Sequence, residues 1–77
     1  MVIYMYFREH PPPHFHVRYA GGEAIIDIAT MHITGGRLPH RVRRLVTDWG
    51  LQHRVRLLEN WRRVMQHERL LWIEPPE

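Results

Sequence analysis

The sequence predicts a single α+β domain, residues 1–77, in which a small antiparallel β-sheet packs against one long or kinked C-terminal helix. A chain of 77 residues has room for one modest core and excludes a second domain. Before residue 36, apolar and polar residues alternate with a period of two, and after residue 39 apolar residues recur at spacings of three and four. The 44% hydrophobic and 25% charged content is typical of a globular protein.

Three strands are predicted first. The segment from Val2 to Phe7 is rich in β-branched and aromatic residues and stops at a proline run, as a strand would. The segment from His14 to Tyr19 alternates polar and apolar side chains, so its two faces differ. One face carries His14, His16 and Arg18, and the other carries Phe15, Val17 and Tyr19. The segment from Glu23 to Ile28 alternates in the same way and predicts the third strand.

Gly21-Gly22 is expected to form the turn between the second and third strands, because glycine tolerates the positive φ angles of a two-residue hairpin. This turn would place Val17 opposite Ile26 on the apolar face. On the polar face it would place His16 directly opposite Asp27, within reach of a side-chain contact.

The remaining elements are a short strand, a helix and a final strand. Met31 to Thr34 is expected to form the fourth strand, with His32 on the face of His16. Apolar spacing predicts a helix over residues 39–66, which Gly50 is expected to kink or split. Leu70 to Ile73 has the length and composition of a short C-terminal strand.

Positive charge is concentrated in the predicted helix. All eleven basic residues are arginine, and the segment from Arg37 to Arg63 contains eight of them with two acidic residues, a local balance of +6. Arg41, Arg43 and Arg44 fall off the apolar stripe and are candidates to bind a nucleic acid or an acidic partner. A solvated helix face explains the same pattern equally well.

Three of the seven histidines, His10, His14 and His16, lie within seven positions. Residues i and i+2 of a strand face the same side, so His14 and His16 can address one target. With His10 or Asp27 they form a candidate site for a divalent metal, although the cofactor expectation includes none at all. Histidines that are only hydrogen-bonded in a half-exposed sheet remain an alternative.

The same face also provides groups for metal-free acid–base chemistry on RNA. His14 and His16 would act as acid or base and Asp27 would orient them. Arg8 and Arg18 would bind phosphate, because the planar guanidinium group suits that anion.

Cysteine is absent, which excludes disulfides and thiolate chemistry and fits a reducing compartment, so a cytoplasmic location is expected. The apolar N-terminal stretch reaches a charged pair at Arg8-Glu9 and is too short to span a membrane. No membrane partner is therefore expected.

Several segments together resemble the domain-of-unknown-function family numbered 4160, a family of small bacterial proteins. They are His10 to Val17, Glu23 to Ile28, Gly36 to Pro39, and Trp49 with His53 and Leu57 to Trp61. The resemblance implies family-typical positions at His10, His14, His16, Glu23, Asp27, His53, Asn60 and Trp61. It also implies an arrangement like a toxin–antitoxin pair, with a neighbouring small domain numbered 2442, and some members are labelled transcriptional regulators.

The leading hypothesis is a toxin–antitoxin-like component that binds or cleaves RNA with its His/Asp/Arg sheet face. Its expected partners are RNA or a small antitoxin-like protein, and an exposed sheet edge makes a homodimer another candidate assembly. The first alternative is a non-enzymatic regulator that binds through the arginine-rich helix. The second alternative is a metal-dependent hydrolase.

Overall fold

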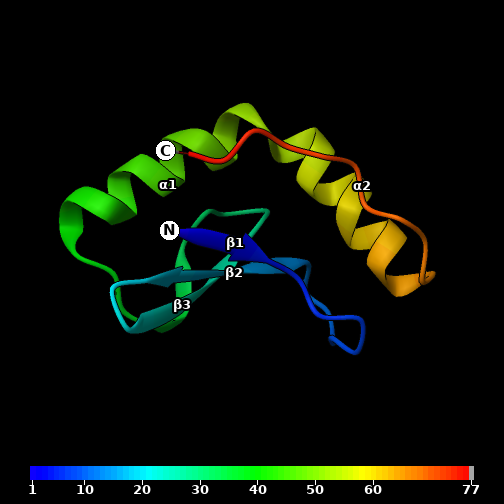
Figure 1. Cartoon of the computed structure of the whole chain (residues 1–77), viewed down its shortest axis with the longest axis horizontal. Coiled ribbons are helices and arrows are strands. Elements are labelled where there is room, and N and C mark those ends of the chain that lie inside the picture. The colour runs from blue at the N-terminus through cyan, green and yellow to red at the C-terminus, as the bar shows by residue number, and fades with distance from the viewer. Residues whose placement is uncertain (77) are drawn as a thin grey trace.

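The computed structural model describes residues 1–76 and contains four strands followed by two helices. The elements are β1 (Val2–Tyr4), β2 (His14–Tyr19), β3 (Gly22–Asp27), β4 (Ile33–Gly36), α1 (His40–Gln52) and α2 (Arg54–Met65). The strands form one antiparallel sheet in the order β1-β2-β3-β4. Both helices lie on the same side of this sheet (Figure 1), so the predicted α+β class is confirmed.

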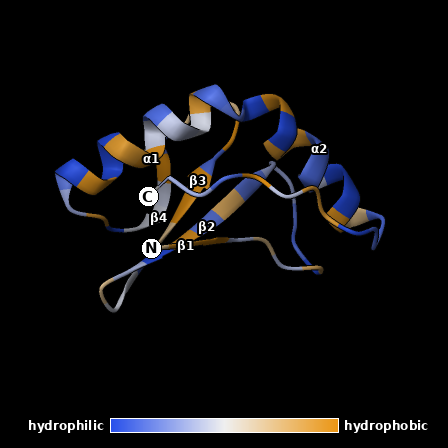
Figure 2. Ribbon diagram, turned by 45° about the horizontal axis from the view of Figure 1, so that its top comes forward, coloured by the Kyte–Doolittle hydropathy of each residue, from blue (hydrophilic) through white to orange (hydrophobic). Residues whose placement is uncertain are grey.

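The core lies between the sheet and the helices. Phe15, Val17 and Ile26 point from the sheet into it and are completely buried. Val46 and Leu57 meet them from α1 and α2. Polar and apolar segments alternate along both helices (Figure 2), as expected for helices that bury one side. The predicted apolar face of β2 is therefore the core face.

The hairpin between β2 and β3 turns at Ala20-Gly21, one residue earlier than Gly21-Gly22. Ala20 and Gly21 both have positive φ angles, 47° and 81°, which is the requirement of a type I′ hairpin turn. This turn pairs His16 with Ile25 and leaves Asp27 opposite His14. The predicted His16–Asp27 pairing is therefore wrong by two positions. A two-residue shift keeps every side chain on its face, so Asp27 stays on the histidine face.

The fourth strand also begins later than predicted, at Ile33 rather than at Met31. The Asp27 carboxylate accepts a hydrogen bond from the Thr30 N–H at 3.0 Å and forms a polar turn there, which delays the strand. The strand then continues past Thr34 through Gly35 and Gly36. Gly36 has a φ of 75°, and a Cβ atom there would lie 1.9 Å from a carbonyl oxygen of β3, so only glycine fits.

The helical region is split, but not at Gly50. The break is at His53, whose φ of −112° and ψ of 17° lie outside the helical values. Gly50 stays within α1 and is buried against Met31, where a Cβ atom would lie 2.5 Å from the Met31 Sδ. This glycine therefore permits close packing and does not break the helix. Neither helix in residues 1–76 is both long and apolar enough to cross a membrane.

The predicted strand at Leu70–Ile73 is wrong, because this segment is extended but pairs with no strand within residues 1–76. Its backbone is bound by helix side chains instead. Asn60 donates to the Leu71 carbonyl at 3.0 Å and accepts from the Leu71 N–H at 2.7 Å. Trp49 donates its indole N–H to the Glu74 carbonyl at 2.7 Å. The segment therefore runs back along the helices (Figure 1).

The hairpin turn gives a direct test of the β2–β3 register. Replacing Ala20 with Asn, a residue that tolerates positive φ, should stabilise the protein by about 1 kcal/mol. Replacing Gly21 with Ala should destabilise it by about 1–2 kcal/mol, because nothing lies within 4 Å of the added Cβ and only the backbone is strained. The melting temperature should rise for the Ala20 variant and fall for the Gly21 variant, by roughly 4–8 °C per kcal/mol. If neither substitution changed the stability of the protein, the assignment of this turn would be contradicted.

Candidate functional site

The open face of the sheet, opposite the helices, carries a compact group of ligand-type side chains. β2 supplies His14 and His16, and the loop from residue 5 to residue 13 brings Glu9 over them. One donor atom from each of the three residues lies within 4.8 Å of the other two. We call Glu9, His14 and His16 the site cluster, and the sheet face that carries it the site face.

The Glu9 carboxylate lies between the two imidazole rings. Its Oε1 is 2.5 Å from His16 Nε2, and its Oε2 is 3.2 Å from His14 Nε2. The side chains are well shielded from water, since His16 is 8% exposed, His14 13% and Glu9 15%. Shielding of this kind strengthens each charged contact relative to the same contact in water.

The outer nitrogen of each ring has its own partner. His14 Nδ1 lies 2.8 Å from the Pro12 carbonyl oxygen, and His16 Nδ1 lies 3.3 Å from Glu23 Oε2. A carbonyl oxygen only accepts hydrogen bonds, so the Nδ1 of His14 carries a proton. Both rings therefore use Nδ1 outward and direct Nε2 towards Glu9.

Aromatic rings pack against both histidines and fix their orientation. The Tyr4 ring stacks on His16 with the ring centroids 5.1 Å apart, and the Tyr6 ring meets His16 edge-on at 4.8 Å. The Trp61 ring, from α2, lies 5.0 Å from the ring of His14. The site cluster is thus held jointly by the sheet, the loop and α2.

Tyr4 links the cluster to a basic group. Arg18 lies over the Tyr4 ring, 5.0 Å from its centroid, and donates to the Tyr4 hydroxyl at 3.5 Å. Hydrogen bonding to the Glu23 carboxylate, followed by burial, raises the pKa of Tyr4 to about 12. The same hydrogen bond is the main cause that lowers the pKa of Glu23, against an opposing effect of burial and with a smaller lowering from His16.

The structure brings only some of the predicted site residues together. His14 and His16 share one site, as predicted. Asp27 lies on the same face, but its carboxylate binds the Thr30 N–H, so it does not orient His16. His10, which was predicted to join His14 and His16 in a metal site, is exposed and lies outside the cluster.

The carboxylates that contact His16 are Glu9 and Glu23. Glu23 is among the positions that the family resemblance implied, but Glu9 was missed. Its only sequence signal is its place just before His10 and the proline run, which reverses the chain over the site face.

The predicted arginines lie on three elements: the loop, β2 and α1. Arg18 is exposed on the site face and Arg8 is exposed on the loop beside Glu9. Arg41, Arg43 and Arg44 are exposed on α1. In Figure 1 the loop lies well away from the start of α1, whereas the β2–β3 hairpin lies at the same end of the molecule as that start. Arg8 is therefore separated from the α1 arginines, but Arg18 is next to Tyr19, which lines a hollow together with Arg41 and Arg44.

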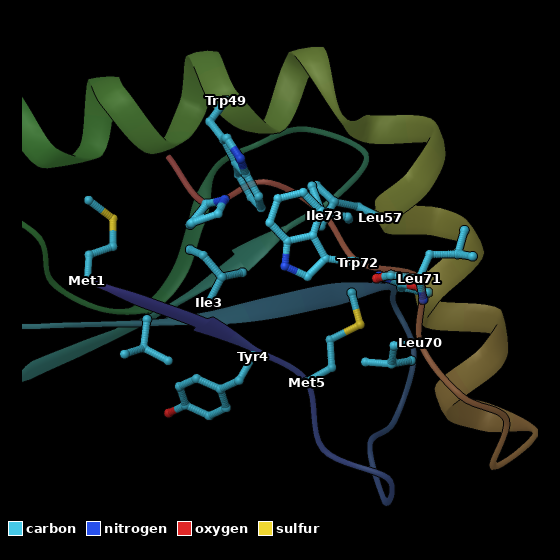
Figure 3. A pocket seen from close by; sticks show the side chains of 13 residues that line it. Met1, Ile3, Tyr4, Met5, Trp49, Leu57, Leu70, Leu71, Trp72 and Ile73 are labelled. Carbon is cyan, nitrogen blue, oxygen red and sulfur yellow. The ribbon is translucent and has the colours of Figure 1, made fainter. Parts of the chain in front are cut away.

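A separate apolar pocket of about 390 Å³ lies between β1 and the C-terminal segment (Figure 3). Trp49, Leu57 and the segment Leu70–Ile73 line it, together with residues of β1. No histidine, carboxylate or arginine lines this pocket. This pocket therefore contributes no ligand-type side chains to the site cluster.

The fold and the site cluster define a small α+β domain with a histidine–carboxylate site on the open face of its sheet. The family model described as "Domain of unknown function (DUF4160)" matches residues 1–62, and the chain belongs to this family. The matched range contains the whole sheet, α1 and the complete site cluster. Searches of curated proteins and of solved structures find no match.

The Tyr4–Glu23 contact predicts a measurable titration. With Glu23 present, the Tyr4 hydroxyl should titrate near pH 12, and Glu23→Gln should move its pKa towards the ordinary value of 10.0 because the carboxylate charge is removed. NMR of tyrosine labelled at the ring Cζ can follow this change. Glu68→Gln, which removes a carboxylate paired with Arg62, is the matched control and should have no effect. An unchanged Tyr4 in Glu23→Gln would refute the assignment.

Proposed function

We propose that the protein binds single-stranded RNA across the site face and the loop, with a phosphodiester beside the site cluster. The observation that carries this proposal is a set of exposed aromatic and basic side chains on β2 and on the loop that closes over the shielded histidine–carboxylate group. Tyr6 and Phe7 are 48% and 57% exposed, and Arg8 and Arg18 are exposed beside them in the chain or on the same sheet face.

Exposed aromatic rings favour single-stranded nucleic acid because unpaired bases stack on them. The ring of Tyr6 lies 4.8 Å from the ring of His16, so a base stacked on Tyr6 would lie near the cluster. The ring of Phe7 is stacked on that of His67 at 5.6 Å, which fixes its position. A preordered ring loses little conformational entropy when a base binds.

An arginine on the site face can bind the phosphate that RNA and DNA share, and a histidine there can act on the 2′-hydroxyl that only RNA has. Arg18 can bind a phosphate with guanidinium N–H groups that Tyr4 does not use. In the metal-free protein His14, whose Nδ1 carries its proton towards the Pro12 carbonyl, can accept the proton of a ribose 2′-hydroxyl at Nε2. The 2′ oxygen then bonds to the adjacent phosphorus as the bond to the 5′ oxygen breaks, and the protonated His14 gives the proton that it took from the 2′-hydroxyl to the leaving 5′ oxygen. DNA has no 2′-hydroxyl and cannot react in this way.

We also propose that the protein acts as a toxin–antitoxin-like component and binds a small partner protein. The family resemblance implies this role. The proposal also includes a cytoplasmic location, which the absence of cysteine supports.

Binding of a labelled single-stranded RNA should depend on the site face. Tyr6→Ala and Phe7→Ala should each weaken binding by about 5–100-fold, since one base stack contributes about 1–3 kcal/mol. Arg18→Ala should lower the salt dependence of the binding constant by about 0.7 in logarithmic slope, the value for one phosphate contact. The matched control is Trp72→Ala, because Trp72 is 74% exposed but lies outside the site face.

Unchanged binding in Tyr6→Ala, Phe7→Ala and Arg18→Ala would refute the proposed surface. In the same assay, gel analysis shows whether RNA is cut while a matched DNA stays intact. His14→Ala should stop cleavage and retain binding. Cleavage that survives this substitution would refute the assigned chemistry.

A second candidate function is the non-enzymatic regulator, and the observation that favours it is which arginines form ion pairs. In the part of the chain that the structure describes, Arg62 and Arg63 of α2 are paired with Glu59. None of Arg41, Arg43 and Arg44 on α1 has an ion pair within residues 1–76. Unpaired positive charge on one helix is the usual basis of polyanion binding.

The two candidates predict opposite results for the triple substitution Arg41→Gln, Arg43→Gln and Arg44→Gln. At physiological salt the Debye length is about 8 Å, so RNA bound at the site face should lose less than about threefold in affinity. A loss of more than about tenfold in fluorescence anisotropy, with the Tyr6 and Phe7 variants unaffected, would place the binding surface on α1 instead. Thermal unfolding of the triple variant controls for its fold.

A further inference from the structure

We infer that Glu9, His14 and His16 form a binding site for one divalent transition metal ion of the zinc class. The site uses the Glu9 carboxylate and the Nε2 atoms of both histidines as ligands. This inference goes beyond RNA binding and does not depend on it, because metal binding can be measured on the protein alone.

The positions of the three ligand atoms fit such an ion. Zinc binds nitrogen and oxygen at about 2.0–2.2 Å, so tetrahedral ligands lie about 3.3 Å from one another. The two Nε2 atoms are 2.5 Å and 3.2 Å from the nearer Glu9 oxygens, and the three residues offer atoms within 4.8 Å of each other. Small side-chain movements would therefore complete the geometry.

The outer hydrogen bonds are the second, independent observation. A histidine that binds a metal usually donates its other ring N–H to a carboxylate or a backbone carbonyl, which fixes the ring and its tautomer. His14 makes this bond to Pro12 and His16 makes it to Glu23. Both rings therefore present Nε2, and not Nδ1, to the shared centre.

Proton counting also favours a metal ion over hydrogen bonds alone. Each Nδ1 already acts as a donor, so a further N–H from each Nε2 to Glu9 would make both rings positively charged. Their ring centroids are only 5.4 Å apart. A single metal ion accepts both Nε2 lone pairs and the carboxylate, and it leaves both rings neutral.

The ligand types indicate which ions fit. Two imidazoles with one carboxylate suit zinc, manganese and iron, whereas magnesium prefers oxygen ligands throughout. Residues 1–76 contain no cysteine that could compete. Three protein ligands also leave a coordination position for water or substrate, as catalytic zinc sites do.

The test is a calorimetric titration of the full-length, tag-free chain with zinc chloride after chelation and dialysis. One equivalent of zinc should bind, and magnesium should not. Glu9→Gln should weaken zinc binding by more than about 100-fold. Glu23→Gln, which removes the outer carboxylate partner of His16 and of Tyr4 but no metal ligand, should weaken it by about 10–100-fold.

Two further variants control for histidines that lie nearby or are merely exposed. His10→Ala and His32→Ala should bind zinc like the unmodified protein, because both residues lie outside the cluster. Glu9→Gln carries the main test, since Glu9 lies on a loop and its substitution leaves the core intact. A melting temperature for each variant confirms that it is folded, and cobalt absorption reports the coordination number.

The absence of stoichiometric zinc binding would overturn the inference, as would equal binding in Glu9→Gln. Loss of binding in His10→Ala would move the site away from the cluster and would also overturn it. Zinc binding without RNA binding would leave the metal site standing and refute the proposed function. RNA binding without zinc binding would support the proposed function and overturn the metal site.

Discussion

The pairing of β2 with β3 is the constraint on which the other features of the molecule depend. Phe15 and Val17 of β2 are fully buried against the helices, and burying side chains of this size contributes about 1.5–3 kcal/mol each. Because side chains alternate along a strand, this burial forces His14 and His16 to the opposite face. The same free energy that forms the core therefore determines where the histidines lie, and a slip of one residue would exchange the two sets.

The strand alone does not make the site. Glu9 reaches the histidines only because the loop from residue 5 to residue 13 closes over the sheet, where Tyr6 packs edge-on against His16. Trp61 of α2 contacts the ring of His14, which ties the site to the helical layer as well. A rigid strand thus positions two of the groups, and a loop held by aromatic contacts positions the third.

Sequence patterns predicted the α+β class and the two faces of β2, because these depend on local periodicity and burial. They did not predict the register, since an alanine with positive φ has no sequence signal and Ala20 takes that role beside Gly21. The helix break was placed at Gly50, but that glycine serves a contact with Met31 that exists only in three dimensions. The extended segment at Leu70–Ile73 resembles a strand, yet its hydrogen-bond partners are helix side chains. Glu9 depends on the loop path, which periodicity does not encode.

The carboxylates that contact His16 are Glu9 and Glu23 and not the predicted Asp27. This difference changes the chemistry that His16 can perform. A histidine with one carboxylate partner keeps a free ring nitrogen and can act as a general base. His16 has a carboxylate at each nitrogen and its side chain is only 8% exposed, so neither nitrogen is free for a substrate. Its geometry instead suits a metal ligand with one oriented nitrogen directed inward.

RNA binding and metal binding are compatible on this face, because Tyr6 and Arg18 lie beside the cluster while both Nε2 atoms are directed into it. Arg18 would hold a phosphate on the same face, and Glu9, His14 and His16 would hold a metal ion that could acidify a bound water and offset negative charge there.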